Sequence, residues 1–527
     1  MWTRFIKNLC YRLCFMEAYM TIKLQNILFC VFTYLLIPIC LFIVSWLSFV
    51  KGVLICFLLL VGAYYVFHHV KKIYMQESIR IDHWFILILI ILASFLLCTG
   101  HGEFIGANGV DIPWRDAIYY DLISHSWPVV YESNEAALTY YLTYWLPIAG
   151  ITSILEIGRV GAQAILFFWT LLGLYLGALL LCHYVQACKK ETIVSICIFI
   201  FWSGLSILGM IIRSMLGKNQ PLMIDNAPGF SSWRYSTIFS DGYFIGYFIR
   251  TTFDSVANVY NQFIPVLLCT LLFLYLKKEY KLYAFIGLLV LPYSPFGFLG
   301  LSIMMIIYFL SALMKQGNRM FFFKQCFSFA NITALCTILP VYYLYYTSNI
   351  ISEVTSSSGI FAAPLRAYGL TRVSNLFLFY LLSFGIYVFC LRPTKKDVLL
   401  WISVVILCVL PFFKIGVSAD LLWNASVAPY LIIMIAVIKR ILKCIRNKNF
   451  WGRDLCLALC LCIAMLTPFM QASSTLRASF LHKSRAVYLD PNHVNGTFEG
   501  KEVKEYKNFL SHDYKNSLFY LYLGKHD

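Results

Sequence analysis

Long apolar runs limit what this chain can fold into. Several approach or exceed about 18 residues, the length of an α-helix that crosses the hydrocarbon core of a bilayer. Examples are 26–50, 85–97, which extends at both ends, and 192–212. Continuous runs exclude a membrane β-barrel, because barrel strands alternate apolar and polar residues. We therefore predict an all-α integral membrane protein.

Composition agrees with this class. The chain is 60% hydrophobic and 13% charged, whereas a soluble domain has about a quarter of its residues charged. The net charge of +17 follows the excess of Lys and Arg in cytoplasmic loops of membrane proteins. No basic stretch alternates with stacking aromatic residues in a soluble domain, so we expect no nucleic-acid partner. The 18 cysteines show no zinc-ligand spacing and lie mostly in apolar runs, where they act as small apolar residues.

The order of the charged clusters predicts a topology. Basic clusters at Lys71-Lys72, Lys189-Lys190, Lys277-Lys278 and 439–453 mark the inner side of a membrane, and most acidic residues then fall outside. We predict about 13 transmembrane helices in a polytopic domain over 1–470. An extracytoplasmic tail follows over 471–527, and its final segment is either a strand or an amphipathic helix.

An acidic, aromatic loop over 101–135 stands out in this basic chain. Asp111, Asp116 and Asp121 lie five residues apart, so on a helix they diverge by about 140° and cannot share a face. Pro113 suits a first helical turn, with Asp111 just before the helix. The alternative to a catalytic role is N-capping and solvation, which we favour for Asp116 alone.

Three further segments belong to the outer side in this topology. The span count places 136–157, rich in Tyr and Trp, as an interfacial or re-entrant helix, although a span stays open. A second outer loop covers 213–262, ahead of a span predicted over 263–276. Pro and Gly in 292–297 predict two short half-helices that meet near the outer face.

Five segments carry a family resemblance. They are DIPWRDAIYYDLISHSWPV (111–129), YYLTYWLPIAGI (140–151), SPFGFLGL (294–301), SADLLWNASVAPYLI (418–432) and NSLFYLYLGK (516–525). Together they resemble a group of bacterial multi-pass proteins with the layout of the GT-C superfamily of glycosyltransferases. The group has His-Asn where this chain has Arg115-Asp116, and Met-Arg where this chain has Trp423-Asn424. The second difference removes an arginine from this chain.

The resemblance implies an enzyme that transfers a sugar from a polyprenyl-phosphate donor to a glycan or lipid acceptor. It implies a multi-pass protein of the bacterial inner membrane with its active site on the outer face. An acid of the first outer loop, Asp111 or Asp121, would deprotonate the acceptor hydroxyl in an inverting displacement. Asp116 is the third catalytic candidate. Carboxylates also hold divalent cations such as Mg²⁺ or Mn²⁺, so metal dependence stays open.

Binding of the donor phosphate needs cations near the membrane surface. Arg250 is the first candidate, followed by Arg234, because guanidinium binds phosphate through two hydrogen bonds. A snorkelling interfacial arginine is an equal alternative for Arg250. The remaining substrate-binding candidates are Trp114, Arg115, His125, Asn261, Gln262, Ser294 and Asp420.

Several of these candidates have a simpler interpretation. Asn261 and Gln262, at the head of a span, bind sugar hydroxyls or cap the helix. Asp420 joins the site or forms a surface ion pair with Lys414. A loop histidine such as His125 more often has no special role.

A second class of function remains open, a transporter or flippase for lipid-linked saccharides, and a polymerase would share these substrates. The broken helix near 292–297 suits a transporter. The near absence of charged residues inside the predicted spans favours the enzyme. No strand, Gly-rich turn and helix unit for a nucleotide sugar is visible in the sequence.

Overall fold

The fold is built from long apolar helices. The computed structural model describes residues 20–81, 83–105, 111–188, 190–208, 211, 248–315, 319–349, 359–360, 376–415, 419–481, 497–501, 506 and 508–525. Within these ranges, eight helical segments are long and apolar enough to cross a membrane. They are α2 (Leu24–Trp46), α3 (Phe49–Ile73), α7 (Arg159–Tyr184), α10 (Thr252–Leu276), α12 (Pro295–Leu313), α14 (Phe329–Thr347), α19 (Asp420–Ala425) continued by α20 (Val427–Asn447), and α21 (Arg453–Leu481). They indicate a multi-pass membrane protein.

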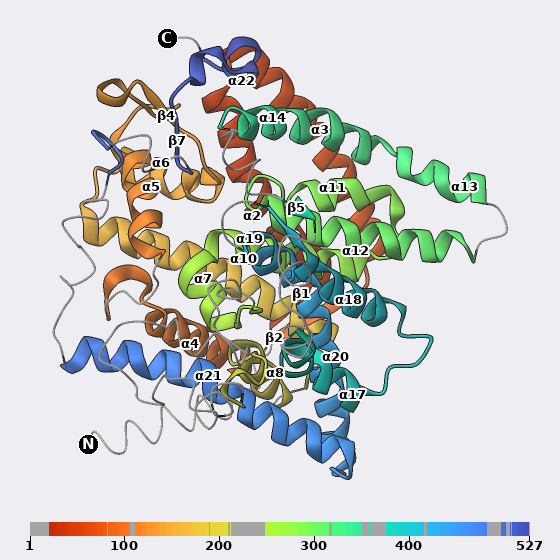
Figure 1. Cartoon of the computed structure of the whole chain (residues 1–527). Helices are drawn as coiled ribbons and strands as arrows, with labels where there is room; N and C mark the ends of the chain where they lie inside the picture. Colours follow the sequence, from red (N-terminus) through yellow and green to blue (C-terminus); the bar gives the residue numbers. More distant parts are fainter. Residues whose placement is uncertain are drawn as a thin grey trace.

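Shorter helices and small sheets join these elements (Figure 1). The shorter α-helices are α4 (His83–Cys98), α5 (Ile112–Ser124), α6 (Leu146–Ile154), α8 (Lys190–Ile200), α11 (Tyr283–Leu288), α13 (Arg319–Lys324), α17 (Ile386–Leu391), α18 (Val398–Val409) and α22 (Leu518–Tyr522). Strands β1 (Met20–Lys23) and β2 (Ser78–Ile81) pair antiparallel. Strand β4 (Ala136–Leu138) pairs with β3 (Val130–Tyr131) and β7 (Leu510–Ser511), and β5 (Gly359–Ile360) pairs with β6 (Phe413–Lys414).

Burial separates central from peripheral helices. The apolar window of α10 is 94% buried, whereas that of α3 is only 33% buried. Large apolar side chains of α3, such as Phe57 and Tyr64, are exposed. In a bilayer such side chains face lipid, so α3 is a peripheral helix and α10 a central one.

Helix α10 is longer than predicted. It begins at Thr252, well ahead of the predicted start at residue 263. The Thr251 side chain accepts a hydrogen bond from the Asp254 N–H (2.9 Å) and so caps the helix. Polar side chains fill its first turns and are buried by protein, which explains why hydropathy missed the true start.

Helix α8 is shorter than the span predicted over 192–212, because it ends at Ile200. Residues 201–205 beyond it are irregular, and the Trp202 carbonyl accepts a hydrogen bond from Thr252 N (3.1 Å). Gly204 lies so close to another segment that a Cβ there would be 2.9 Å from the Ser383 Cα. This close backbone approach needs glycine, and it replaces the predicted continuous helix.

The segment over 136–157 is not a single helix. It begins as β4, passes through a 3₁₀ turn at Leu142–Trp145 and ends as α6. A helix as short as α6 rises only about 14 Å, which does not cross a bilayer. Tyr144 and Trp145 are buried rather than at a surface. The aromatic residues of this segment therefore pack inside the protein.

The helix break near residue 292 differs from the prediction in the length of its second helix. Only α11 is short, since α12 is long enough to span a membrane. At the break, the Tyr293 hydroxyl donates to the Leu35 carbonyl of α2 (2.5 Å), and the hydroxyl of Tyr346, near the end of α14, donates to the Pro292 carbonyl (3.0 Å). The prediction of two short half-helices is therefore wrong.

The C-terminal part packs on the acidic loop. Helix α21 continues to Leu481, past the predicted boundary at 470, because Gln471 is buried and accepts a hydrogen bond from the Thr251 hydroxyl (3.1 Å). Strand β7 then extends the sheet of the acidic loop (Figure 1). The final segment forms the short helix α22, followed by a bridge from Gly524 to Leu47.

Each ion pair among the described residues joins segments that the predicted topology places on the same side. Those between segments predicted for the inner side are His69–Glu279, Arg440–Asp454 and Arg446–Glu191. On the other side, His125 of the acidic loop faces Glu499 of the tail (3.6 Å). No ion pair between described residues joins a predicted inner segment to a predicted outer one. We call these two ends of the bundle the lysine end and the acidic end.

Candidate functional site

A charged cluster at the acidic end joins three segments that are far apart in the sequence. Asp111 and Arg115 come from the start of α5, with a 3.8 Å ion pair between them. Arg250 and Asp254 come from the start of α10 and are also 3.8 Å apart. Asp420, the first residue of α19, interacts electrostatically with both arginines and with Asp111. The sequence predicted four of these residues, and the fold brings them together.

Asn258 of α10 connects α5 to α10. Its side-chain oxygen accepts from the Asp111 N–H (3.4 Å), and its carbonyl accepts from the Arg115 Nε–H (3.3 Å). Its Nδ2 donates to Asp254 Oδ1 (2.8 Å). Arg115 also donates to the hydroxyl of Tyr140. The loop acid is therefore positioned by hydrogen bonds to a central helix rather than left mobile in solvent.

Asp111 is the accessible carboxylate of the Asp111–Arg115 pair. Its side chain is 36% exposed, compared with 5% for Arg115. It occupies the N-cap position of α5 as predicted, but its side chain makes no capping hydrogen bond. N-capping by the side chain is therefore not its role, and the carboxylate is partly open to solvent.

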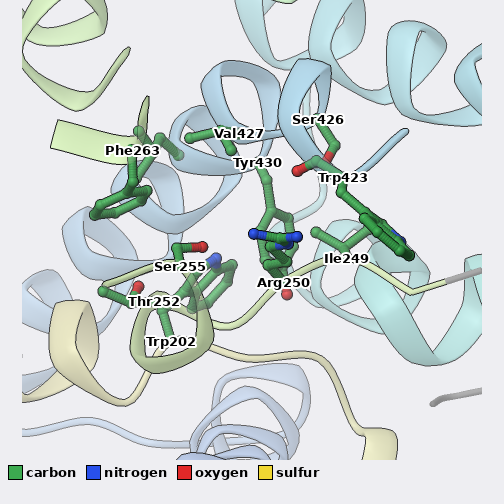
Figure 2. A pocket seen from close by; sticks show the side chains of 11 residues that line it. Trp202, Ile249, Arg250, Thr252, Ser255, Phe263, Trp423, Ser426, Val427 and Tyr430 are labelled. Atoms are coloured by element: carbon green, nitrogen blue, oxygen red, sulfur yellow. The ribbon is translucent and has the colours of Figure 1, made fainter. Parts of the chain in front are cut away.

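Arg250 is buried, and two of its guanidinium nitrogens form no hydrogen bond with a described residue. Its Nε and Nη1 have no hydrogen-bond acceptor among the described residues, although the guanidinium lies over the Trp423 ring (5.2 Å to the centroid). It borders a cavity of about 10 Å³ with Thr252, Ser255 and Tyr430 (Figure 2), which is the size of one water molecule. A buried guanidinium with unused donors favours an oxyanion as its partner.

Asp116 and Asp121 lie outside this cluster, as their spacing predicted. Asp116 accepts from the Gln163 amide of α7 (3.2 Å). Asp121 Oδ2 accepts from the Tyr131 hydroxyl (2.6 Å) and from the Phe498 N–H (2.9 Å). Burial raises the pKa of Asp121, against the effect of these hydrogen bonds. The contacts of Asp121 fasten the tail to the loop.

Trp114 and His125 also contact the tail. The Trp114 ring stacks on Phe509, with centroids 5.4 Å apart and an interplanar angle of 1°. His125 faces Glu499 across 3.6 Å. Both predicted substrate-binding residues therefore hold the C-terminal segment in this structure, which gives each of them a structural role.

Asn261 and Gln262 lie inside α10, not at the head of a span as predicted. Gln262 Oε1 accepts from the Ser294 hydroxyl (3.1 Å), and Ser294 in turn caps α12 through Gly297 N (3.1 Å). Asn261 is fully buried, and its amide atoms have no partner among the described residues. Together with Asn258 these residues form a polar stripe along the central helix.

Some predictions fall outside the described residues, and two residues of the site, Asp254 and Asn258, were not predicted. Arg234 and the side chain of Lys414 lie outside the described part, so the structure says nothing of them. Asp254 was not singled out, although its spacing of four from Asn258 marks one helical face. The described residues contain no group of three or more His, Cys, Asp and Glu that could hold a metal ion.

Comparison of the chain with protein-family models, with curated proteins and with solved structures gives no match. The resemblance to GT-C glycosyltransferases therefore stays a prediction.

Proposed function

We propose that this protein is a membrane glycosyltransferase that takes a sugar from a polyprenyl-phosphate donor. One observation carries the proposal: an accessible carboxylate, Asp111, lies in the same charged cluster as two buried arginines, Arg115 and Arg250. Transfer from a lipid phosphate needs a base for the acceptor and cations for the leaving phosphate. The acceptor is a glycan or lipid on the outer face of a bacterial inner membrane.

Asp111 acts as the general base in this proposal. Its carboxylate takes the proton of the acceptor hydroxyl while that oxygen forms a bond to the anomeric carbon. The bond from this carbon to the phosphate oxygen breaks, and the oxygen leaves with the electron pair. Attack from the opposite side inverts the anomeric centre. The charge that develops on the polyprenyl phosphate is stabilised by Arg250, whose free donors match an oxyanion.

Asp254 and Asp420 balance part of the positive charge of the arginines. Asp254 Oδ2 is 3.8 Å from Arg250 Nε, beyond hydrogen-bond distance, so it balances the charge of Arg250 without occupying its donors. Trp423 supports the other side of the guanidinium. Trp423 stands where the resembling group has methionine, so this chain would place its phosphate-binding arginine just before α10 rather than on α19.

A transporter or flippase for lipid-linked saccharides is the second candidate. The polar stripe of Asn258, Asn261 and Gln262 inside a central helix favours it, because buried amides within a span often line a solute path. The charged cluster at one end of the bundle favours the enzyme, since transport places its substrate site near the bilayer midplane.

Transfer by purified protein in detergent tests the proposal. Given a polyprenyl-phosphate-linked sugar and a range of glycan and lipid acceptors, the protein should form a glycosidic product. Polyprenyl phosphate should appear in a one-to-one ratio with that product. Detergent removes the two compartments that transport requires but leaves chemistry intact. Binding of the donor without turnover on every acceptor would overturn the enzyme and support the transporter.

A further inference from the structure

A cavity lined by lysines lies at the lysine end of the bundle, opposite the candidate site. Its volume is about 480 Å³, and its charged lining includes Lys277, Lys315, Lys396 and Lys439. Helices α10, α12, α18 and α20 pack against one another around it. The volume falls within the range of about 300–1,000 Å³ that is typical of small-molecule sites.

The cavity and the candidate site lie at opposite ends of the same helices. Helix α10 follows Arg250 and ends just before Lys277, and a helix of its length rises about 37 Å. Likewise α19 begins at Asp420, and Lys439 lies in the second half of α20, which continues α19. This distance matches the thickness of a bilayer, so the lysine cavity lies at the level of the lipid head groups.

Four lysines and one acid leave the lining of the cavity with a net positive charge, although Lys439 also lies over the Tyr184 ring (4.0 Å to the centroid). None of the four lysines forms an ion pair with a described residue. The only acid of the lining, Asp397, accepts hydrogen bonds from the N–H and hydroxyl of Thr394 (2.7 and 2.8 Å). Burial and the charge of Lys278 lower the pKa of Lys277. An anion in the cavity would relieve this repulsion.

The other walls of the cavity are apolar. Leu274 of α10 and Ile432 and Ile435 of α20 face it, and both isoleucines are largely buried. Cytoplasmic lysines that only follow the topology rule need no enclosed apolar wall beside them. The cavity thus has lysines on one side and apolar side chains on the other. Such a lining suits a molecule that carries a phosphate on an apolar chain.

We propose that the lysine cavity binds a phosphomonoester or pyrophosphate group, at the membrane face opposite the charged cluster. A phosphomonoester carries about two negative charges near pH 7, and ammonium groups bind such oxyanions through charge-assisted hydrogen bonds. The phosphate comes either from a lipid head group or from a soluble anion. This proposal does not depend on the proposed sugar transfer.

The test measures binding of phosphatidic acid, a lipid phosphomonoester, to the purified full-length protein by native mass spectrometry. Lys315→Gln/Lys396→Gln should weaken saturable binding by about tenfold or more. Both lysines are exposed, so the substitutions should not disturb folding. The control Lys443→Gln/Lys448→Gln removes the same charge from exposed positions near the end of α20, outside the cavity, and should leave binding unchanged.

A second pair of variants and two competitors complete the test. Lys277→Gln/Lys439→Gln should weaken binding at least as much, and phosphatidylcholine with the same chains should not compete. Displacement of phosphatidic acid by inorganic pyrophosphate supports the site with a soluble anion as its ligand. Failure of pyrophosphate to bind supports the site with a lipid as its ligand. Unsaturable binding of both probes, or equal weakening in the control pair, overturns the proposal.

Discussion

His101 shows how burial controls the charge of a single residue at the acidic end. It is 4% exposed, and its Nδ1 lies 2.9 Å from the Thr99 hydroxyl. Its Nε2 has no partner among the described residues, and its ring meets Tyr260 edge-on at 4.5 Å. Burial lowers the pKa of His101 to about 3. The imidazole is therefore neutral in the folded protein at any ordinary pH.

This burial predicts a loss of stability in acid. In the unfolded chain His101 takes up a proton near its ordinary pKa of about 6.5, but in the folded protein only near pH 3. Stability should fall as the pH drops from about 6.5 towards 3, by up to about 1.4 kcal/mol per pH unit. Thermal unfolding of wild type and His101→Gln between pH 7 and pH 5 measures the difference in slope.

The control for this prediction is His512→Gln, because His512 is exposed. Asp121 has a raised pKa, so its contribution is present at low pH and is lost as the pH rises through its raised pKa. Its opposite slope is common to all three proteins and cancels in the comparison. Equal slopes for wild type and His101→Gln would contradict the account of a buried neutral imidazole.

At the scale of elements, α12 and α19 approach so closely that only glycine fits between them. A Cβ on Gly300 would lie 2.0 Å from the Ala425 carbonyl oxygen. Because that atom belongs to the backbone, Gly300→Ala must push the helices apart. We expect a loss of about 1–3 kcal/mol in the free energy of unfolding. Transfer activity should fall too, since α19 carries Asp420.

Gly158→Ala is the matched control, because a Cβ on Gly158 meets no atom within 4 Å. Thermal unfolding of both variants in detergent makes the comparison. If Gly300→Ala unfolds at the same temperature as Gly158→Ala, the close packing of α12 on α19 is wrong.

The sequence predicted elements well where hydropathy and local geometry act alone. The first turn of α5, with Asp111 before it and Pro113 within it, forms as expected, because capping and proline geometry are local. Prediction failed at both ends of the second outer loop. Helix α10 begins in polar residues that only tertiary burial explains, and α8 stops where Gly204 meets another segment.

The candidate site was predictable as a set of residues but not as an arrangement. The acidic loop led to the prediction of Asp111 as a base. The expected phosphate of the donor led to the prediction of Arg250 as its ligand. No local pattern connects α5, α10 and α19, whose meeting depends on long-range packing. For the same reason the sequence does not predict that Asp121 accepts hydrogen bonds from Tyr131 and Phe498, which join the tail to the loop.

At the scale of the whole molecule, the two charged ends should lie on opposite sides of the membrane. A membrane-impermeant maleimide, applied to intact cells, should label Ser133→Cys and Lys515→Cys in a cysteine-free background. Lys72→Cys and Lys448→Cys should react only after permeabilisation. All four positions are exposed, unlike the buried Ser511 of the tail.

The reverse pattern of labelling would invert the topology and move the charged cluster to the cytoplasmic face. Labelling of Ser133→Cys and Lys448→Cys under the same conditions would place both ends on one side, against the packing of the spans.

The rate of sugar transfer by Asp111→Asn tests most directly whether Asp111 is the base of a transferase. Asn keeps the shape of the side chain but cannot accept the acceptor proton. The rate should be lower by about 10²–10⁴-fold, with unchanged unfolding temperature. Asp513→Asn, at an exposed position in the tail, should retain the wild-type rate. Near-wild-type transfer by Asp111→Asn would contradict the account, because the charged cluster would then lack its base.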